Sequence, residues 1–285
     1  MAKTSDILKE LDASPYYGRG QHFLTNQNIA RRIVDLAGPG PDDVVVEIGP
    51  GTGALTGLLV EKAGRVIAIE SDRKLADYLT DAFKGSAQII FGDALSFDYR
   101  GLGEKIGAPF MVVANLPYNI STELIFRLLD VREYVDAMVL MLQKEVAQRL
   151  GAGPGTKEYG VLTVLVTVLC DVSVALSVGP GNFHPRPKVD SRVVLFHTLK
   201  EPRIHITDMH LFKRVVRASF GTRRKTLRNA LKSLSDLVDR DELITIEEKT
   251  GIDFGRRGET LTLDEFALIA DSLHRVLNEN PAGSS

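Results

Sequence analysis

The chain has 285 residues, which is room for one large domain or two unequal ones. Its hydrophobic content of 44% and its charged content of 25% are ordinary for a globular protein. No apolar run reaches the roughly 18 residues of a membrane span, and residues 1–12 carry both signs of charge where a secretion signal would be apolar. The single cysteine, Cys170, permits no internal disulfide, and no Cys/His cluster suggests zinc. We therefore expect a cytoplasmic protein without a metal site.

Strands and helices alternate through the first half of the chain, after a flexible segment at residues 1–20. Asn26 can cap a helix that ends before Pro39. The strands that follow are predicted at residues 44–48, 65–70, 88–91, 110–114 and 137–142, and the helices between them at 54–63, 72–83 and 121–129. This alternation predicts an α/β domain with a mostly parallel sheet and helices on both faces.

The pattern changes after residue 142. Residues 161–169 suit either a strand or a buried helix, and residues 172–178 and 192–199 are predicted strands. From about residue 203 the pattern is helical only, with Thr207 and Thr222 as candidate caps and a capping box formed by Thr262 and Glu265. We therefore predict an α/β domain over residues 21–202 and a small helical domain over residues 203–285.

A glycine-rich loop over residues 47–56 (EIGPGTGALT) joins the first strand to its helix. Glycines at such a turn let the backbone approach a ligand closely at a helix N-terminus. Glu70 ends the second strand, where a ribose-binding acid belongs. The spacing fits a nicotinamide dinucleotide as well as S-adenosylmethionine, and glycine spacing alone does not separate the two.

Three features favour S-adenosylmethionine over the dinucleotide. Glu47 would repel a pyrophosphate but suits a cationic methionine moiety, and Asp93 follows the third strand, where a carboxylate can accept from an adenine amine. The tetrapeptide Asn115-Leu116-Pro117-Tyr118 follows the fourth strand, beyond the carboxyl end of a buried run. An ordinary strand-to-loop turn is the alternative for this tetrapeptide. An amide acceptor and a flat ring at this place are what methylation of an exocyclic base amine requires.

In these features the chain resembles the ribosomal RNA adenine N6-dimethyltransferases. The matching motifs occur in order at residues 20–24 (GQHFL), 47–56, 92–95 (GDAL), 115–118 (NLPY), 183–191 (FHPRPKVDS) and 258–263 (GETLTL). The resemblance covers nearly the whole chain. It implies a Rossmann-like, S-adenosylmethionine-dependent methyltransferase domain followed by a helical RNA-binding domain.

The resemblance also implies roles for individual residues. Six match positions that contact S-adenosylmethionine in the family: His22, Leu24, Gly49, Glu70, Asp93 and Asn115. The family commonly has Asn where this chain has His22, and either side chain can form a hydrogen bond. For catalysis we expect the Asn115 side-chain oxygen and the Leu116 or Pro117 carbonyl to accept the two amine hydrogens. Tyr118 would stack on one face of the flipped base and Phe183 on the other.

Several details favour the KsgA (RsmA) type within the family, which dimethylates two adjacent adenosines in a hairpin near the 3′ end of small-subunit (16S) rRNA. They include Leu116, where Erm enzymes commonly have Ile, the loop at residues 183–188 (FHPRPK) and the segment at residues 220–227 (FGTRRKTL). The alternative is Erm-type dimethylation of one adenosine in large-subunit rRNA. The expected partner is rRNA in a partly assembled small subunit, bound by a monomeric protein.

A basic stretch between Lys213 and Arg228 contains no acidic residue. Its second half is the predicted RNA-binding group: Arg223, Arg224, Lys225 and Arg228. The alternative is a solvated helix face that binds nothing. The absence of interleaved acids favours contact with RNA phosphates.

Overall fold

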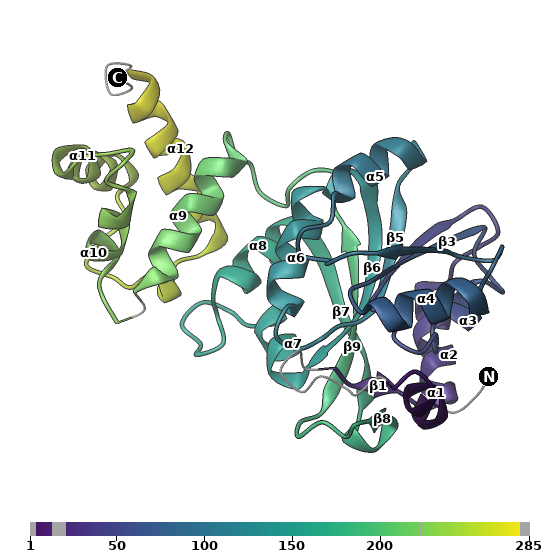
Figure 1. Ribbon diagram of the computed structural model, residues 1–285. Coiled ribbons are helices and arrows are strands. Elements are labelled where there is room, and N and C mark those ends of the chain that lie inside the picture. Colours follow the sequence, from purple (N-terminus) through teal and green to yellow (C-terminus); the bar gives the residue numbers. More distant parts are fainter. Residues whose placement is uncertain (1–3, 13–20, 223, 280–285) are drawn as a thin grey trace. The chain divides into compact units, whose positions relative to one another are not determined.

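The computed structural model describes residues 4–12, 21–222 and 224–279 (Figure 1). It divides into two compact units. The first comprises Met1–Ala147 with Asp171–Thr198, and the second comprises Gln148–Cys170 with Leu199–Ser285. Within the described residues, no helix has both the length and the apolar character to cross a membrane.

A seven-stranded sheet forms the first unit, in the order β4-β3-β2-β5-β6-β9-β7. The strands are β2 (Val44–Ile48), β3 (Arg65–Glu70), β4 (Gln88–Phe91), β5 (Phe110–Asn115), β6 (Val135–Gln143), β7 (Cys170–Val178) and β9 (Ser191–Thr198). The pairs from β4 through β6 are parallel, and β9 runs antiparallel to β6. The predicted α/β fold with a mostly parallel sheet is therefore confirmed.

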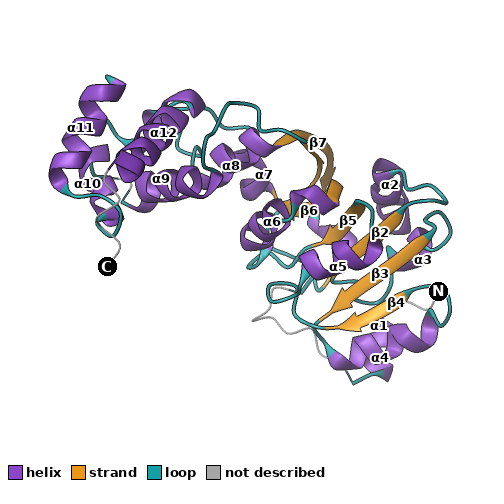
Figure 2. Ribbon diagram, turned by 90° about the horizontal axis from the view of Figure 1, so that it is seen from above, coloured by secondary structure: helices purple, strands orange, loops and turns teal. Residues whose placement is uncertain are grey.

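Helices cover both faces of this sheet (Figure 2). On one face lie α2 (Gln27–Ala37), α3 (Thr56–Leu59) and α4 (Arg73–Ala82); on the other lie α5 (Tyr99–Ile106) and α6 (Ser121–Asp130). Ile33 and Val34 of α2 pack with Val113 and Val139 in a buried apolar cluster. The helix predicted over residues 54–63 is wrong in extent, because turns occupy the residues on either side of α3.

The chain reverses its direction of travel across the sheet at β2. From β2 it runs outward through β3 to β4, and then returns to β5 on the opposite side of β2. The crevice between the carboxyl ends of β2 and β5 is therefore a topological switch point, where open α/β sheets bind their ligands. The glycine-rich loop follows β2, and Asn115 ends β5.

The N-terminal segment is partly helical, which corrects the flexible segment predicted over residues 1–20. Helix α1 (Thr4–Glu10) buries Ile7 and Leu8, and Leu8 packs with Phe23 and Leu75. Residues 13–20 lie outside the described part of the chain. After them, β1 (Phe23–Leu24) pairs antiparallel with β8 (Phe183–His184), which joins two segments far apart in sequence.

The second unit is helical. Its helices are α8 (Val161–Leu169), α9 (Met209–Gly221), α10 (Leu227–Leu231), α11 (Arg240–Thr250) and α12 (Leu263–Glu279). The first boundary between the two units falls within α7 (Lys144–Leu150), between Ala147 and Gln148. The ambiguous segment 161–169 is a helix, and nearly every residue of it is buried. Residues 148–170 thus pack with the helical unit, whereas the sequence-based boundary placed them in the α/β domain.

Capping residues fix several helix ends. Asn26 accepts from the amides of Asn28 and Ile29 as predicted, but α9 is capped by Asp208 and not by Thr207. The predicted capping box is confirmed: Thr262 N–H donates to Glu265 Oε2 (2.8 Å), and Glu265 N–H donates to Thr262 Oγ1 (3.2 Å).

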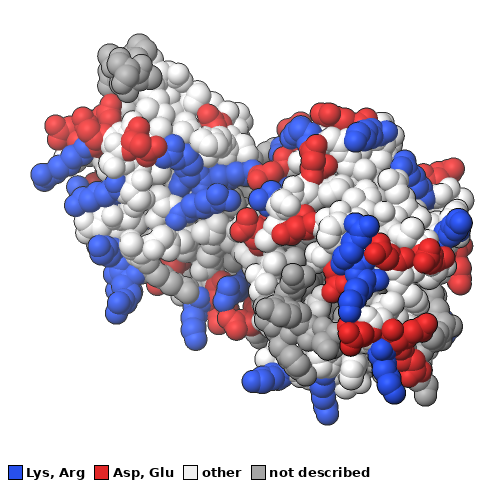
Figure 3. All heavy atoms as spheres, viewed as in Figure 1, with Lys and Arg blue, Asp and Glu red and all other residues white. Residues whose placement is uncertain are grey.

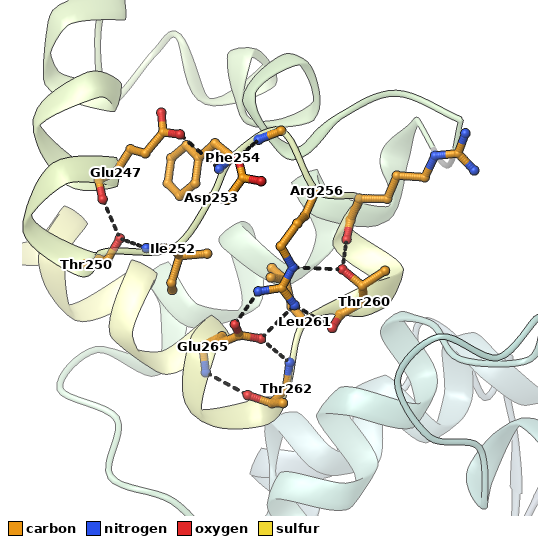
Figure 4. Close-up of polar contacts among 12 residues, drawn as sticks. Glu247, Thr250, Ile252, Asp253, Phe254, Arg256, Thr260, Leu261, Thr262 and Glu265 are labelled. Carbon is orange, nitrogen blue, oxygen red and sulfur yellow. Dashed lines mark hydrogen bonds and ion pairs between the residues drawn. The ribbon is translucent and has the colours of Figure 1, made fainter.

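Glu265 also anchors the segment that leads into α12 (Figure 4). Arg256 donates to Glu265 Oε1 (2.5 Å) and to the Thr260 carbonyl (2.8 Å), and the guanidinium holds the pKa of Glu265 below its usual value. A fork of this kind ties a loop to the helix that follows it.

Candidate active site

A pocket lies at the switch point of the sheet. Its empty space, counted out to the open mouth and into the solvent there, is about 810 Å³. All six residues predicted to contact the cofactor line it: His22, Leu24, Gly49, Glu70, Asp93 and Asn115. Leu116 and Pro117 line it too, so the predicted cofactor and base-amine groups meet in one cavity.

The glycine-rich loop depends on the absence of side chains. Gly49, Gly51 and Gly53 all have positive φ (68°, 59° and 84°), a region that other residues rarely adopt. A Cβ on Gly51 would stand 2.8 Å from the ring of Phe23, which is itself buried. The loop therefore places bare backbone against the pocket.

Glu70 is buried at the end of β3 and is held by the loop. Its Oε2 accepts from Gly51 N–H (3.2 Å) and its Oε1 from Asp72 N–H (2.8 Å). Burial raises the pKa of Glu70, and these backbone bonds oppose that rise. Asp93 is exposed at the pocket rim, where its Oδ1 accepts from Leu95 N–H (2.8 Å).

Glu47 is the second buried carboxyl group of the pocket, with only 1% of its surface exposed. Its Oε2 accepts from the Thr56 hydroxyl at 2.6 Å. Burial raises the pKa of Glu47 to about 8; the Thr56 bond lowers it and the nearby Glu70 charge raises it.

The two carboxyl groups have a common electrostatic requirement. Neither forms an ion pair with a basic side chain of the described residues. A buried carboxylate without a cation is costly, so it takes up a proton or binds a positively charged ligand. The pocket thus disfavours a pyrophosphate, and it suits a cationic ligand whose charge would stabilise the ionised form of the two carboxyl groups.

We expect the ligand-free protein to lose stability as the pH rises from about 5 to about 8. The folded Glu47 holds its proton up to about pH 8, while the unfolded side chain loses it near its ordinary pKa of 4.5. The folded state therefore binds more protons in this window, and stability falls by at most about 1.4 kcal/mol per pH unit for one group. Melting temperatures at successive pH values measure this slope.

Glu47→Gln should flatten the slope, because an amide does not titrate. Glu61→Gln is the matched control, since Glu61 is exposed on the same unit. The prediction is wrong if Glu47→Gln and the parent protein show the same dependence on pH.

Asn115 connects the sheet edge to the N-terminal segment. Its Nδ2 donates to the His22 carbonyl at 2.8 Å, while its Oδ1 has no bond to a described residue. The His22 Nδ1 lies 2.8 Å from the Pro185 carbonyl; since a carbonyl only accepts, Nδ1 carries the proton. The His22 side chain is thus engaged with the Pro185 segment, and its backbone oxygen with Asn115.

The two predicted stacking rings lie in different environments, and neither lines the pocket. Tyr118 is half-buried: its hydroxyl is hydrogen-bonded to Ser191 Oγ (3.0 Å), and its ring centroid is 5.2 Å from that of His22. Phe183 is only 6% exposed and belongs to the apolar cluster that contains Leu24 and Leu176. Stacking on a base would require Phe183 to leave this packing, so the structure supplies no support for that role.

The predicted RNA-binding residues differ in their surroundings. Arg223 lies outside the described residues, and Arg224 and Lys225 are exposed in the turn before α10. Arg228, however, forms an ion pair with Glu247 (2.5 Å), and Arg214 forms one with Asp236 (2.6 Å). Figure 3 shows basic side chains gathered over α9 on the face that it draws. Acidic residues outside the basic stretch therefore neutralise part of its charge. The sequence of the stretch itself does not show these ion pairs, because their acidic partners lie further along the chain.

Two polar residues of the site went unrecognised in the sequence. Thr56 and Ser191 are fully buried, and each forms a hydrogen bond with a site residue, Glu47 and Tyr118 respectively. Both stand inside the matching motifs, at residues 47–56 and 183–191. Their position in those motifs could have indicated that Thr56 and Ser191 belong to the site.

Comparison with known proteins agrees with this geometry. The family model described as "Ribosomal RNA adenine dimethylase" matches residues 17–273. The curated relatives include "Ribosomal RNA small subunit methyltransferase A" of Geobacter sulfurreducens, 51% identical over 257 residues (89% of this chain and 93% of the relative). The protein of the same name from Magnetococcus marinus is 45% identical over 268 residues (93% and 94%).

Solved structures extend the comparison. A dimethyladenosine transferase from Plasmodium falciparum is 27% identical, with a TM-score of 0.71 over 91% of this chain and 98% of that chain. The 23S rRNA methyltransferase ErmE, 23% identical with a TM-score of 0.62 over 88% and 99% of the two chains, shares the fold. With the family model matched over most of its length, the chain belongs to the ribosomal RNA adenine dimethylase family and is an S-adenosylmethionine-dependent rRNA methyltransferase.

Proposed function

We propose that this protein dimethylates N6 of two adjacent adenosines in a hairpin near the 3′ end of small-subunit rRNA. Its substrate would be a partly assembled small subunit in the cytoplasm, and it would act as a monomer. One observation carries the proposal: a pocket that favours a cationic ligand opens beside Asn115, Leu116 and Pro117. The supporting relatives, 51% and 45% identical, are small-subunit methyltransferases by name.

The residues of the pocket suit S-adenosylmethionine. The buried carboxyls of Glu47 and Glu70 match its positive charges and ribose hydroxyls, and Asp93 at the rim can accept from its adenine amine. The bare backbone at Gly49 and Gly51 leaves room for the methionine moiety. When bound, S-adenosylmethionine supplies a methyl group that is electrophilic enough for transfer without a strong protein base.

Positioning of the adenine amine is then the task of the 115–118 turn. The Asn115 Oδ1 would accept one amine hydrogen. The Leu116 carbonyl would accept the other, because the Pro117 carbonyl already accepts from Ile120 N–H (3.3 Å). Two acceptors draw the nitrogen toward tetrahedral geometry and free its lone pair, and orientation of this kind contributes much of the rate.

Tyr118→Phe should leave methyl transfer within about threefold of the parent rate, because the ring and its stacking remain. The variant should be less stable by about 1 kcal/mol, because buried Ser191 loses its hydrogen-bond partner. Turnover and denaturant unfolding separate the two effects. A large loss of turnover in Tyr118→Phe, matching that of Tyr118→Ala, would assign the hydroxyl a direct role.

Arg224→Gln/Lys225→Gln should weaken RNA binding and flatten its dependence on salt. Each phosphate contact contributes about 0.7–0.9 to the slope of log K against log salt, so two lost contacts lower the slope by about 1.5. Both side chains are exposed in the turn before α10. Binding of RNA by fluorescence anisotropy at several salt concentrations measures the slope, and an unaltered slope would contradict the assignment.

The proposed substrate is tested by mapping methylated nucleotides. Unmethylated small and large subunits would each be incubated with the protein and labelled methyl donor, and the modified positions located by primer extension and mass spectrometry. We expect two adjacent dimethyladenosines in the small subunit only. A single modified adenosine in the large subunit would favour the Erm type instead.

A further inference from the structure

A loop rich in proline lies directly beside the 115–118 turn. The proline loop, residues 185–190, follows β8 and leads into β9. Its first residue receives the hydrogen bond of His22 Nδ1 at the Pro185 carbonyl (2.8 Å). At its far end, Ser191 Oγ is bonded to the Tyr118 hydroxyl (3.0 Å). Both ends of the loop are therefore attached to residues around the site of methyl transfer.

Further contacts hold the same loop in place. The pairing of Phe23 with His184 joins its start to β1, and Lys144 N–H donates to the Asp190 carbonyl (3.0 Å) at its end. Pro187 is buried in the middle. These contacts and the two prolines restrict the backbone of the loop, and so they fix the points from which its outward side chains extend.

The exposed side chains of the loop are two basic residues, one apolar residue and the acidic Asp190. Arg186 and Lys188 are exposed, and neither forms an ion pair with an acid of the described residues. Val189 stands between Lys188 and Asp190 with 44% of its surface exposed, unusual for a large apolar side chain in this protein. Two cations beside an exposed apolar side chain suit a nucleic acid, which offers phosphates beside sugars and bases.

The position of the loop decides which phosphates it could reach. A base that enters between Asn115 and Tyr118 carries its own ribose and two flanking phosphates, and these must remain at the rim of the site. Ser191 and His22 both contact Tyr118, and His22 is bonded to Pro185, so the proline loop adjoins the Tyr118 side of the turn.

We propose that the proline loop is an RNA-binding surface of the α/β unit, in which Arg186 and Lys188 bind the phosphates flanking the target adenosine. This rests on the proposed function, and it concerns a surface separate from the basic turn before α10. The loop would hold the nucleotide in the flipped position by charge, while the 115–118 turn orients the amine.

The test compares two double variants of the full chain. Arg186→Gln/Lys188→Gln removes the two charges of the loop. Lys84→Gln/Lys105→Gln removes two exposed charges of the same unit that form no ion pair with a described acid. Lys84 follows α4 and Lys105 lies in the last turn of α5, so both lie toward the amino ends of the strands, opposite the pocket.

Three measurements are made on each variant: calorimetric binding of S-adenosylmethionine, methylation of unmethylated small subunits, and salt-dependent binding of a hairpin RNA. For the loop variant we expect unchanged cofactor binding and kcat/KM for subunits lowered at least tenfold. We also expect a salt slope shallower by about 1.5. The control variant should match the parent in all three, and Arg186→Lys/Lys188→Arg should restore activity.

The outcomes distinguish failure of the proposed function from failure of the loop assignment alone. If the parent protein does not methylate small subunits, the proposed function fails and the loop assignment fails with it. If the parent is active and the loop variant equals it in kcat/KM and salt slope, only the loop assignment is overturned. Should the double variant bind no cofactor, the single variants Arg186→Gln and Lys188→Gln are measured in its place, and wild-type slopes in both overturn the proposal.

Discussion

Asn115→Ala should lower the rate of methyl transfer about 100-fold or more, with a much smaller loss of cofactor affinity. The alanine removes the Oδ1 acceptor that would orient the adenine amine, and loss of one such group at a reacting centre typically costs about 10²–10³ in kcat. It also removes the bond from Nδ2 to the His22 carbonyl, which loosens one wall of the pocket. Single-turnover rates together with calorimetric titration of S-adenosylmethionine separate the two losses.

Asn119→Ala is the matched control for this experiment. Asn119 is an exposed asparagine in the same turn region and does not line the pocket, so its removal should leave both quantities unchanged. A rate for Asn115→Ala within threefold of the parent would rule out the positioning role. A loss of affinity as large as the loss of rate would show that Asn115 serves the cofactor and not the amine.

Gly51→Ala should weaken S-adenosylmethionine binding at least tenfold and destabilise the protein. At φ 59° the new Cβ is strained, which costs about 1–2 kcal/mol. It would also stand 2.8 Å from the ring of Phe23, which cannot move freely because it packs with Leu8 and Leu75. Since Gly51 N–H donates to Glu70, displacement of the loop would also shift that carboxylate. Calorimetric titration and thermal unfolding measure the two effects.

Gly85→Ala isolates the backbone strain from the clash. Gly85 also has positive φ (80°), but a Cβ there would meet nothing within 4 Å, and it lies away from the pocket. We expect this variant to lose stability by about 1 kcal/mol and to bind the cofactor normally. If Gly51→Ala behaves in the same way as Gly85→Ala, the close packing of the loop against Phe23 is not needed for binding.

Local sequence patterns were sufficient for most of the sheet. The strands at residues 44–48, 65–70 and 88–91 have the predicted bounds, because each is a short apolar run flanked by turn or capping residues. Helices with weak periodicity escaped prediction. Helix α5 contains Gly101 and Gly103, which lower its helix propensity and interrupt its apolar periodicity, although Asp98 caps it. Charged residues dominate α11, although Asp239 and Glu242 form a capping box that could have indicated it.

Some residues of the site could also be predicted from local sequence, and others could not. The glycine-rich loop, Asp93 and Asn115 stand directly after strands, so the topology of a parallel sheet predicts that they converge. The burial of Phe183 and the pairing of Arg228 with Glu247 depend on which segments pack together. No pattern within a single window of sequence contains that information, so these residues could be placed only by the structure.

The division of the chain between its units limits how the protein can be cut. Because residues 148–170 pack with the helices after residue 199, a fragment that ends at Thr198 would retain α8 without its packing partners. Val164, Val166 and Leu169 of that helix are fully buried, and loss of α9, which contacts α8, would uncover apolar surface of this helix. An exposed apolar helix invites aggregation. Exchange of the RNA-binding helices between relatives would therefore require two grafts, residues 148–170 together with the C-terminal segment, and a single junction near residue 200 would yield an insoluble chimera.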